Sequence, residues 1–299
     1  MSTVRTRTVS TEPEHVALQA RDVHFDWTGL PLRWIPNEAF ASHVLNVLHI
    51  LLPEGERFFV KVFSEALPFI KDDQLREDVI GFIGQEGMHA AAHQGVQDYF
   101  TAQGLDTSGY VAEIEHIFQR LLGDRGLIGF KKDEWLIERL ALVAAVEHVT
   151  AFLGHWILNT PGLDEAGGDP RMLDLLRWHG AEEVEHRAVA YDVYMHLDGR
   201  YVRRARTYAI AATTLIWLFV RGTNYLLEHD PTMHTRQRAG AKDLVRSARK
   251  GLTPSYLDIA KCGWRYFMPG YHPAQEGSTS QAVAYLAKSA VALAATLPR

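Results

Sequence analysis

Two short stretches decide the fold of this chain: QEGMH at residues 85–89 and HGAEEVEH at residues 179–186. Each holds a glutamate followed three residues later by a histidine, namely Glu86 with His89 and Glu183 with His186. On an α-helix, residues i and i+3 lie on one face about a turn apart, so both side chains can reach one metal ion. Two such pairs on separate helices make half of a two-metal site inside a four-helix bundle.

One further glutamate from each remaining helix would complete such a site. Glu56 lies in GERFFVKVF, and Glu147 interrupts the apolar run LALVAAVEHVTAFL. An ionised carboxylate in such surroundings costs several kcal/mol unless it is paired or bound to a metal. A single glutamate of this kind is more often an ordinary core residue or points outward. Four glutamates with two histidines indicate a metal site.

Helical periodicity runs through the chain from Asn37 onward, because apolar residues recur at three- and four-residue spacing between short Gly, Pro and Asp clusters. No segment shows the alternating pattern typical of a strand, so the fold class is all-α. The predicted helices cover residues 38–51, 54–67, 73–101, 110–122, 132–159, 170–196, 203–228, 239–250, 254–265 and 279–296.

The turns predict two antiparallel hairpins, one bending at residues 68–73 (PFIKDD) and one at residues 160–170 (TPGLDEAGGDP). The residues between the hairpins include a short helix, which predicts a long crossover. Glu56 lies twelve residues before Pro68, and Glu86 lies thirteen after Asp73. At 1.5 Å per residue, both lie roughly 18–20 Å below the turn.

The second hairpin repeats this arrangement. Glu147 lies thirteen residues before Thr160, and Glu183 lies twelve after Arg171. Four carboxylates at one level would offset the charge of two divalent ions. Carboxylate oxygen with imidazole suits two iron ions or manganese, and zinc is possible.

Other histidines and glutamates near the two motifs are candidates for supporting roles. His179 precedes Glu183 by four residues and lies on the same helical face, so it is an additional candidate ligand. His93 has the same relation to His89 and is a ligand or an outer hydrogen-bond partner, as Glu182 and Glu185 would be. We expect the remaining apolar-segment histidines to be core or surface residues: His43, His49, His148 and His155.

Composition excludes several classes of protein. The chain has 299 residues, 47% of them hydrophobic, and a net charge of -5 without a basic cluster, so nucleic-acid binding is not expected. One cysteine, Cys262, excludes a disulfide framework and favours the cytoplasm. The N-terminus has no apolar core of a signal peptide.

We expect one domain over residues 1–299, with an arm at 1–36, a metal-binding bundle at 37–200 and covering helices at 201–299. The most apolar stretch, residues 208–220, is too short to cross a bilayer, so no transmembrane segment is expected. It is interpreted as a buried helix that borders a substrate cavity or a subunit interface, with membrane contact as the less favoured alternative.

These residues resemble the carboxylate-bridged di-iron members of the ferritin-like superfamily. Within it, the chain resembles a bacterial family labelled predicted metal-dependent hydrolases, through PEGERFF (53–59), QEGMHAAAH (85–93), EEVEH (182–186) and YFMPGYHP (266–273). The resemblance implies a ferritin-like four-helix bundle with a long crossover and additional N- and C-terminal helices. The implied metal ligands are Glu56, Glu86, His89, Glu147, Glu183 and His186.

The run from His179 to His186 also resembles the extended motif of di-iron arylamine N-oxygenases, in which an additional histidine binds one iron. By this resemblance His179 would tune the second ion, the one held by His186. Ribonucleotide reductase small subunits usually carry a radical tyrosine where this chain has His93, so a stable tyrosyl radical of that type is not expected.

The leading hypothesis from the sequence is an oxidase or oxygenase that activates O₂ at two iron ions and oxidises a small, apolar or aromatic molecule. The first alternative is a metal-dependent hydrolase that uses water bound to the two ions. The second alternative is iron handling by ferrous oxidation. An unidentified electron donor and a homodimer complete the expected partners.

Overall fold

A computed structural model describes residues 12–295 except residue 14 and residues 235–237. Within this part of the chain the regular elements are all helical and no strand is present. The all-α prediction is therefore confirmed.

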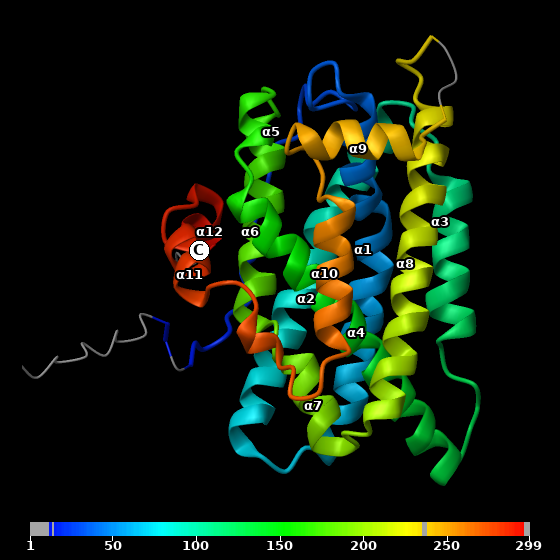
Figure 1. Ribbon diagram of the computed structural model, residues 1–299, viewed down its shortest axis with the longest axis vertical. Coiled ribbons are helices and arrows are strands. Elements are labelled where there is room, and N and C mark those ends of the chain that lie inside the picture. The colour runs from blue at the N-terminus through cyan, green and yellow to red at the C-terminus, as the bar shows by residue number, and fades with distance from the viewer. Residues whose placement is uncertain (1–11, 14, 235–237, 296–299) are drawn as a thin grey trace, which may run out of the picture.

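Four long helices form the bundle: α1 (Ala39–Ala66), α2 (Asp73–Ala102), α4 (Phe130–Asn159) and α6 (Pro170–His186). α1 packs along α2, and α4 packs along α6 (Figure 1). Contacts of α1 with α4 and of α2 with α6 close the four-helix arrangement. The two predicted hairpins are present.

At both predicted turns, an aspartate caps the N-terminus of the helix that follows. The first turn contains the short helix η1 (Leu67–Phe69), and Asp72 then caps α2 by accepting a 2.8 Å hydrogen bond from the amide of Leu75. The second turn contains α5 (Gly162–Glu165), after which Asp169 accepts a hydrogen bond from the amide of Arg171. Pro170 occupies the first position of α6, where no amide donor is needed.

The crossover between the hairpins differs in detail from the predicted helix 110–122. α3 (Ser108–Glu115) continues as a π-helix, η2 (His116–Leu121). The amide of Leu122 donates to the carbonyl of Ile117 over 2.9 Å, which is the five-residue spacing of a π-helix. Periodicity does not predict a change of helix type, because the apolar positions shift by only one residue.

One predicted helix break is absent, and one break that the structure shows was not predicted. Residues 38–51 and 54–67 were expected to form separate helices, but α1 runs through Pro53, whose ring is buried among the core helices. Residues 170–196 were expected to be one helix, but α6 ends at His186 and α7 (Val189–Leu197) follows. The guanidinium of Arg187 bonds to the carbonyl of Val184, which in a continuous helix would accept from Ala188.

The predicted C-terminal helix 279–296 is also divided. α11 (Thr279–Leu286) ends before Ser289, and α12 (Ala290–Ala295) begins after it. The hydroxyl of Ser289 accepts from the amide of Ala292 over 3.3 Å, which is the bond of a helix N-cap. A serine in an apolar run is a weak signal, so periodicity alone joined the two helices.

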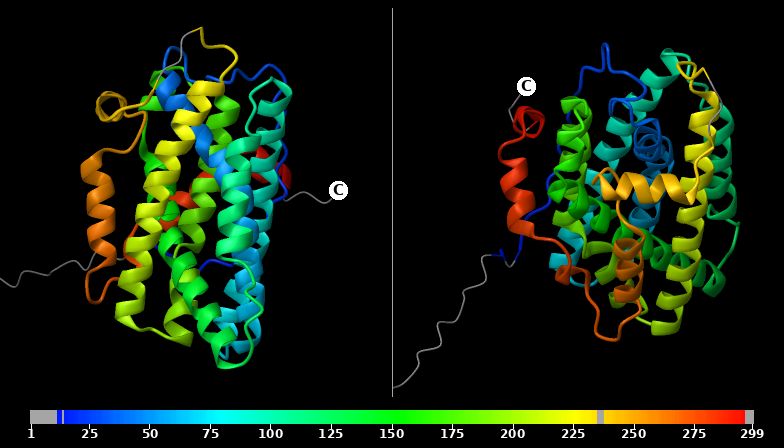
Figure 2. Two further views of the ribbon diagram at one scale, coloured as in Figure 1. Left: turned by 90° about the vertical axis from the view of Figure 1, so that its right-hand side faces the viewer. Right: turned by 45° about the horizontal axis from the view of Figure 1, so that its top comes forward.

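Helices after residue 200 cover the bundle, as expected. α8 (Tyr201–His229) lies against α1 and α4, and α10 (Tyr256–Tyr266) lies against α4 and α8. α9 (Ala241–Arg249) crosses one end of the bundle (Figures 1 and 2). The short helix η3 (Pro273–Gln275) precedes α11, which packs on α6.

α8 contains the apolar stretch 208–220, and the expectation that this segment is buried is only partly correct. By length and composition, α8 is the one helix of the described chain that could cross a membrane, but 39% of its most apolar window is buried. Ile210, Ile216 and Trp217 are each at least half exposed. At its start, Arg203 lies 3.1 Å from a carboxylate oxygen of Glu138, so α8 is tied to α4 by polar contacts.

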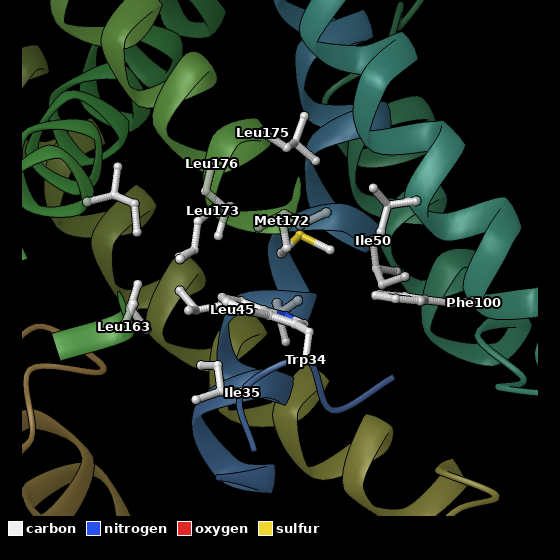
Figure 3. Close-up of a cluster of buried hydrophobic side chains, with 14 of the residues drawn as sticks. Trp34, Ile35, Leu45, Ile50, Phe100, Leu163, Met172, Leu173, Leu175 and Leu176 are labelled. Atoms are coloured by element: carbon white, nitrogen blue, oxygen red, sulfur yellow. The ribbon is translucent and has the colours of Figure 1, made fainter. Parts of the chain in front are cut away.

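The N-terminal arm is part of the core. Residues 15–38 have no long helix, yet Leu30, Leu32, Trp34 and Ile35 are almost fully buried. Figure 3 shows the ring of Trp34 among side chains of α1, α2 and α6. Its indole nitrogen donates to the side-chain oxygen of Asn46 over 2.9 Å, so the ring is buried without an unpaired polar atom.

Candidate metal centre

The bundle brings the seven predicted ligand side chains together, and each is buried. α1 provides one glutamate, α2 a glutamate and a histidine, α4 one glutamate, and α6 a glutamate and two histidines. The seven are Glu56, Glu86, His89, Glu147, His179, Glu183 and His186.

These side chains form two groups, in each of which the ligand atoms lie within 4.8 Å of one another. The first group is Glu56, His89 and His179, and the second is Glu86, Glu147, Glu183 and His186. Neither group comes from a single helix. Two adjacent groups of carboxylate and imidazole donors are what a pair of divalent ions requires.

His186 is directed at three carboxylates. Its Nε2 lies 3.2 Å from Oε1 of Glu86, 3.2 Å from Oε2 of Glu147 and 3.5 Å from Oε2 of Glu183. Its Nδ1 donates to the amide oxygen of Gln85 over 3.0 Å. This bond fixes the imidazole so that Nε2 faces the carboxylates, as in metal-binding histidines. Although burial lowers the pKa of His186, Glu183 and Glu147 hold it well above its usual value, so this nitrogen carries a proton that a metal ion would displace.

His89 is held in the same way by a different partner. Its Nε2 donates to Oε2 of Glu182 over 2.9 Å. Its Nδ1 has no hydrogen-bond partner within the described part of the chain and lies 3.8 Å from Glu86 and 3.7 Å from Glu183. The imidazole therefore presents one unoccupied nitrogen to the carboxylates.

His179 lies near carboxylates of both groups. Its Nε2 is 2.8 Å from Oε1 of Glu183 and 3.7 Å from Oε1 of Glu56. Its ring stacks on that of His89, with 4.1 Å between the ring centroids. The sequence associated His179 with the ion of His186, whereas the structure groups it with Glu56 and His89.

The candidate ligands fit metal ions because many of their donor atoms are buried without a hydrogen-bond partner in the described part of the chain. Nine of them are buried and have no hydrogen-bond partner among the described residues. An unpaired buried polar atom costs about 1–3 kcal/mol, and more if it is charged. Such a concentration in one place is unstable unless the atoms bind something. The nine are both carboxylate oxygens of Glu56, Glu86 and Glu147, Oε2 of Glu183, Nδ1 of His89 and Nε2 of His186.

The electrostatics of the protein alone agree with this test. Burial, with repulsion from neighbouring carboxylates, raises the pKa of Glu56 and Glu86 well above the usual value and raises the pKa of Glu147 to about 7. Burial lowers the pKa of His89 to about 3 and that of His179 to about 4. The two histidines are thus neutral, which is the state that ligates metals.

The outer hydrogen bonds predicted for Glu182, Glu185 and His93 are present. Glu182 accepts from His89, and Glu185 accepts from the amide nitrogen of Gln85 over 3.2 Å. His93 connects His179 to a further buried histidine: its Nε2 lies 2.5 Å from Nδ1 of His179, and its Nδ1 lies 2.7 Å from Nδ1 of His49. His49 was expected to be a simple core residue, but it ends this chain of three imidazoles.

Three residues of the site were missed by the sequence analysis. Arg21 of the arm donates to Oε1 of Glu182 over 2.7 Å, and Trp178 donates to the same oxygen over 3.0 Å. Gln85 fixes His186. Trp178 lies four residues before Glu182 on one helical face, so its contact was predictable. No local pattern points to Arg21, which is 161 residues distant.

The arm reaches the site because two glycines of α2 leave room for it. A Cβ on Gly81 would lie 2.5 Å from the Cβ of Leu18, and one on Gly84 would lie 3.1 Å from the Cβ of Ala20. The chain at residues 18–21 therefore lies directly on α2, and Arg21 follows at the position of Glu182. Arg21 also lies 3.1 Å from Glu185.

The other buried histidines lie outside the two groups, as expected. His43 pairs with Asp230 over 2.9 Å. His148 follows Glu147 but contacts a different set of residues: the hydroxyl of Tyr271 donates to its Nδ1 over 2.6 Å, and its Nε2 donates to the carbonyl of Cys262 over 2.8 Å. Burial raises the pKa of Cys262 to about 12, so it is a neutral thiol.

Comparison with known families gives one match. Residues 19–277 match the family described as predicted metal-dependent hydrolases. No curated protein and no solved structure matches the chain at a significant level. The family description agrees with the hydrolase alternative and with the predicted family resemblance, and it provides no support for the leading hypothesis of O₂ activation.

Proposed function

This chain belongs to the predicted metal-dependent hydrolase family, and we propose that it is a two-metal enzyme that hydrolyses an ester or amide bond of an apolar small molecule. One ion would be held by Glu56, His89 and His179, and the other by Glu86, Glu147, Glu183 and His186. The observation that carries the proposal is the convergence of nine unpaired, buried donor atoms on one place in the bundle.

Two divalent ions at this position would polarise a substrate carbonyl and lower the pKa of water. Hydrolysis adds the elements of water across the bond, giving a carboxylic acid and an alcohol or amine. The chain's own contribution is to fix the donors and to exclude bulk water from the site.

A small cavity gives access to the site. It has a volume of about 50 Å³, which admits water, and it reaches His179 and Glu183 between α1, α4 and α6. Leucine and isoleucine side chains make up half of its lining, among them Leu48, Leu153 and Leu176. Water that enters here therefore meets few other polar groups before it reaches the candidate ligands.

Glu183 is the carboxylate that faces this cavity. Although burial raises its pKa, His186 and His179 hold the pKa well below the usual value, so Glu183 is ionised. A pKa this low makes Glu183 a weak base, so its role in the proposed enzyme is to hold a metal ion on the side from which water enters. His179 beside it hydrogen-bonds to His93, which fixes the orientation of its ring.

A second candidate function is oxidation by O₂ at two iron ions, as in the ferritin-like di-iron proteins that the motifs resemble. The donor set favours it, because four carboxylates with imidazoles and no thiolate suit iron and manganese. An oxygenase that inserts one oxygen atom would also need an external electron donor, which the hydrolase does not need.

One metal-exchange experiment tests both candidates. Metal-free protein is loaded without oxygen with zinc, manganese or ferrous ion, and the bound ions per chain are counted. Each form is then assayed for cleavage of a series of apolar esters and amides, and the ferrous form is also mixed with O₂ and followed by absorbance.

Cleavage that requires the metal and does not require O₂ supports the hydrolase. Rapid O₂ consumption by the ferrous form, with no cleavage in any form, would replace the hydrolase with the oxidase. Continued ferrous oxidation without an organic substrate would instead support iron handling. Binding of fewer than two ions per chain would overturn the two-metal proposal itself.

A further inference from the structure

A large apolar pocket lies between α8 and the bundle helices α1 and α4. It has a volume of about 1020 Å³ and is formed between α1, α3, η2, α4 and α8. Its deeper part is made by buried residues, among them Phe59, Val143 and Ala211. Its outer part is made by half-exposed and exposed residues, including Trp217 and Leu121.

The pocket is long. Along α8 it is lined from Ile210 to Arg221 by residues spaced three and four apart, which places them on one helical face. Eleven residues at 1.5 Å per residue span about 16 Å. α3 lies beside α8 along this length (Figure 1), and the hydroxyl of Tyr110 donates to the carbonyl of Leu218 over 2.8 Å.

The pocket approaches the candidate metal centre at its deep side. Phe59 lies one turn after Glu56 on α1, and Val143 lies one turn before Glu147 on α4. Both are on the helical faces that carry the glutamates, and both line the pocket. One layer of pocket-wall side chains therefore lies one helical turn from two of the candidate ligands.

The π-helix places one ring in that layer. The ring of Phe118 lies 5.5 Å from that of Phe58, measured between centroids. A Cβ on Gly55 would lie 3.5 Å from the Phe118 ring, so this ring covers the backbone immediately before Glu56. Single π-helical turns are often found at functional sites, and here the turn brings Phe118 and Leu121 to the pocket wall.

Polar side chains gather at the opposite end of the pocket. Arg221 of α8 lies 2.6 Å from Glu113 of α3, and His116 is one turn further along from Glu113. The rest of the lining is apolar apart from Thr214. The distribution matches a molecule with a long apolar body and one polar end.

We propose that this pocket binds a long-chain aliphatic ester or amide, with the bond to be cleaved at the deep side beside Phe59 and Val143. Its aliphatic body would lie along α8 past Phe118, and a second, polar end group would lie at Arg221, Glu113 and His116. The proposal rests on the proposed function, because it assigns the substrate class of the same metal centre. Water would reach the metals through the small cavity, and the organic substrate through this pocket.

Binding can be measured without any reaction. The full-length, metal-free protein is titrated with the fluorescent probe 1-anilinonaphthalene-8-sulfonate, which is then displaced by alkanoates and alkanols of increasing chain length. We expect one saturable site per chain and an optimum chain length set by the length of the pocket. A continuous gain in affinity with chain length would indicate adsorption to a surface and would overturn the proposal.

Matched variants locate the site. Thr214→Trp places an indole in the pocket, whereas Thr213→Trp changes the neighbouring residue, which is exposed and does not line the pocket. We expect Thr214→Trp to weaken alkanoate binding about tenfold or more and Thr213→Trp to leave it within a factor of about two. Ala112→Trp on α3 fills the pocket from the facing wall, with Glu115→Trp as its control, in case Thr214→Trp does not fold.

Equal binding by the filled and control variants would overturn the pocket assignment. Metal stoichiometry measured on the same variants separates this failure from failure of the proposed function. Two ions per chain with no alkanoate site would leave the two-metal enzyme standing without this pocket. An alkanoate site in a chain that binds no ions would overturn the claim that the bound molecule is the enzyme's substrate.

Discussion

Arg21 and Glu182 are joined by a 2.7 Å hydrogen bond, and through it the N-terminal arm supports the candidate metal centre. Burial raises the pKa of Glu182 to about 7, and the positive charge of Arg21 opposes that rise. The other oxygen of Glu182 accepts from His89, which leaves Nδ1 of His89 free. The arm therefore determines which nitrogen of His89 faces the carboxylates.

Removing this arginine should weaken metal binding. We expect Arg21→Ala to lower the affinity of one of the two ions about 10- to 100-fold, as for other residues that orient metal ligands. Competition with a metal chelator measures this affinity. Arg21→Lys, which keeps the charge, should retain part of it. Unchanged affinity in Arg21→Ala would show that His89 is oriented without the arm.

A methyl group on Gly81 should displace the arm without changing any residue of the arm itself. Its Cβ would lie 2.5 Å from that of Leu18, so we expect Gly81→Ala to lower the free energy of unfolding by about 1–3 kcal/mol. Gly87→Ala on the same helix is the control, because a Cβ there has no neighbour within 4 Å. That change should be neutral or stabilise by up to about 1 kcal/mol.

Denaturant unfolding of the metal-free variants measures both effects, and proteolysis reports release of the arm. If Gly81→Ala were as stable as Gly87→Ala and equally resistant to proteolysis, the close packing of residues 18–21 on α2 would be wrong.

Glu147→Gln should reduce metal binding from two ions to one. Glu147 belongs to the four-residue group and has both oxygens unpaired, and an amide supplies no negative charge to replace them. Metal analysis after gel filtration gives the stoichiometry. Glu138→Gln is the control, because the side chain of Glu138 is partly exposed and lies on the same helix, and this variant should keep two ions. Two ions retained in Glu147→Gln would contradict this ligand assignment.

Metal binding should release protons at neutral pH. Burial raises the pKa of Glu56 and Glu86 well above the usual value and that of Glu147 to about 7. A carboxyl with a raised pKa keeps its proton below that pKa, and an ion must displace it. Affinity should therefore rise as the pH increases through 7. Titration calorimetry in buffers of different ionisation enthalpy counts the released protons, and a count of zero would contradict the protonation of these carboxyls.

Much of the candidate centre was predictable because its information is local. Glu86 and His89 share a helical face by their spacing, and the same holds for Glu183 and His186. The hairpin turns then place Glu56 opposite Glu86, and Glu147 opposite Glu183, by counting residues from each bend. The rise per residue is constant along a regular helix, so the position of a residue a dozen places from the bend can be predicted without the tertiary structure.

Breaks in the helices were less predictable because they depend on distant contacts. α1 continues through Pro53 because its flanking turns are buried against other helices, which compensates for the missing amide. α6 ends at His186 because Arg187 bonds to Val184 and to the C-terminal segment, including Thr279 over 2.8 Å. Neither cause is visible in the residues next to the break.

The sequence by itself thus determined the all-α fold, the two hairpins and the set of buried donors, since helical periodicity and spacing are properties of neighbouring residues. Only the tertiary structure decided which donors form a group, as His179 with Glu56 shows. It alone placed Arg21 on Glu182 and opened the long pocket beside α8. These features arise where segments more than a hundred residues apart pack together, and a side chain's partner across such a distance is set by packing.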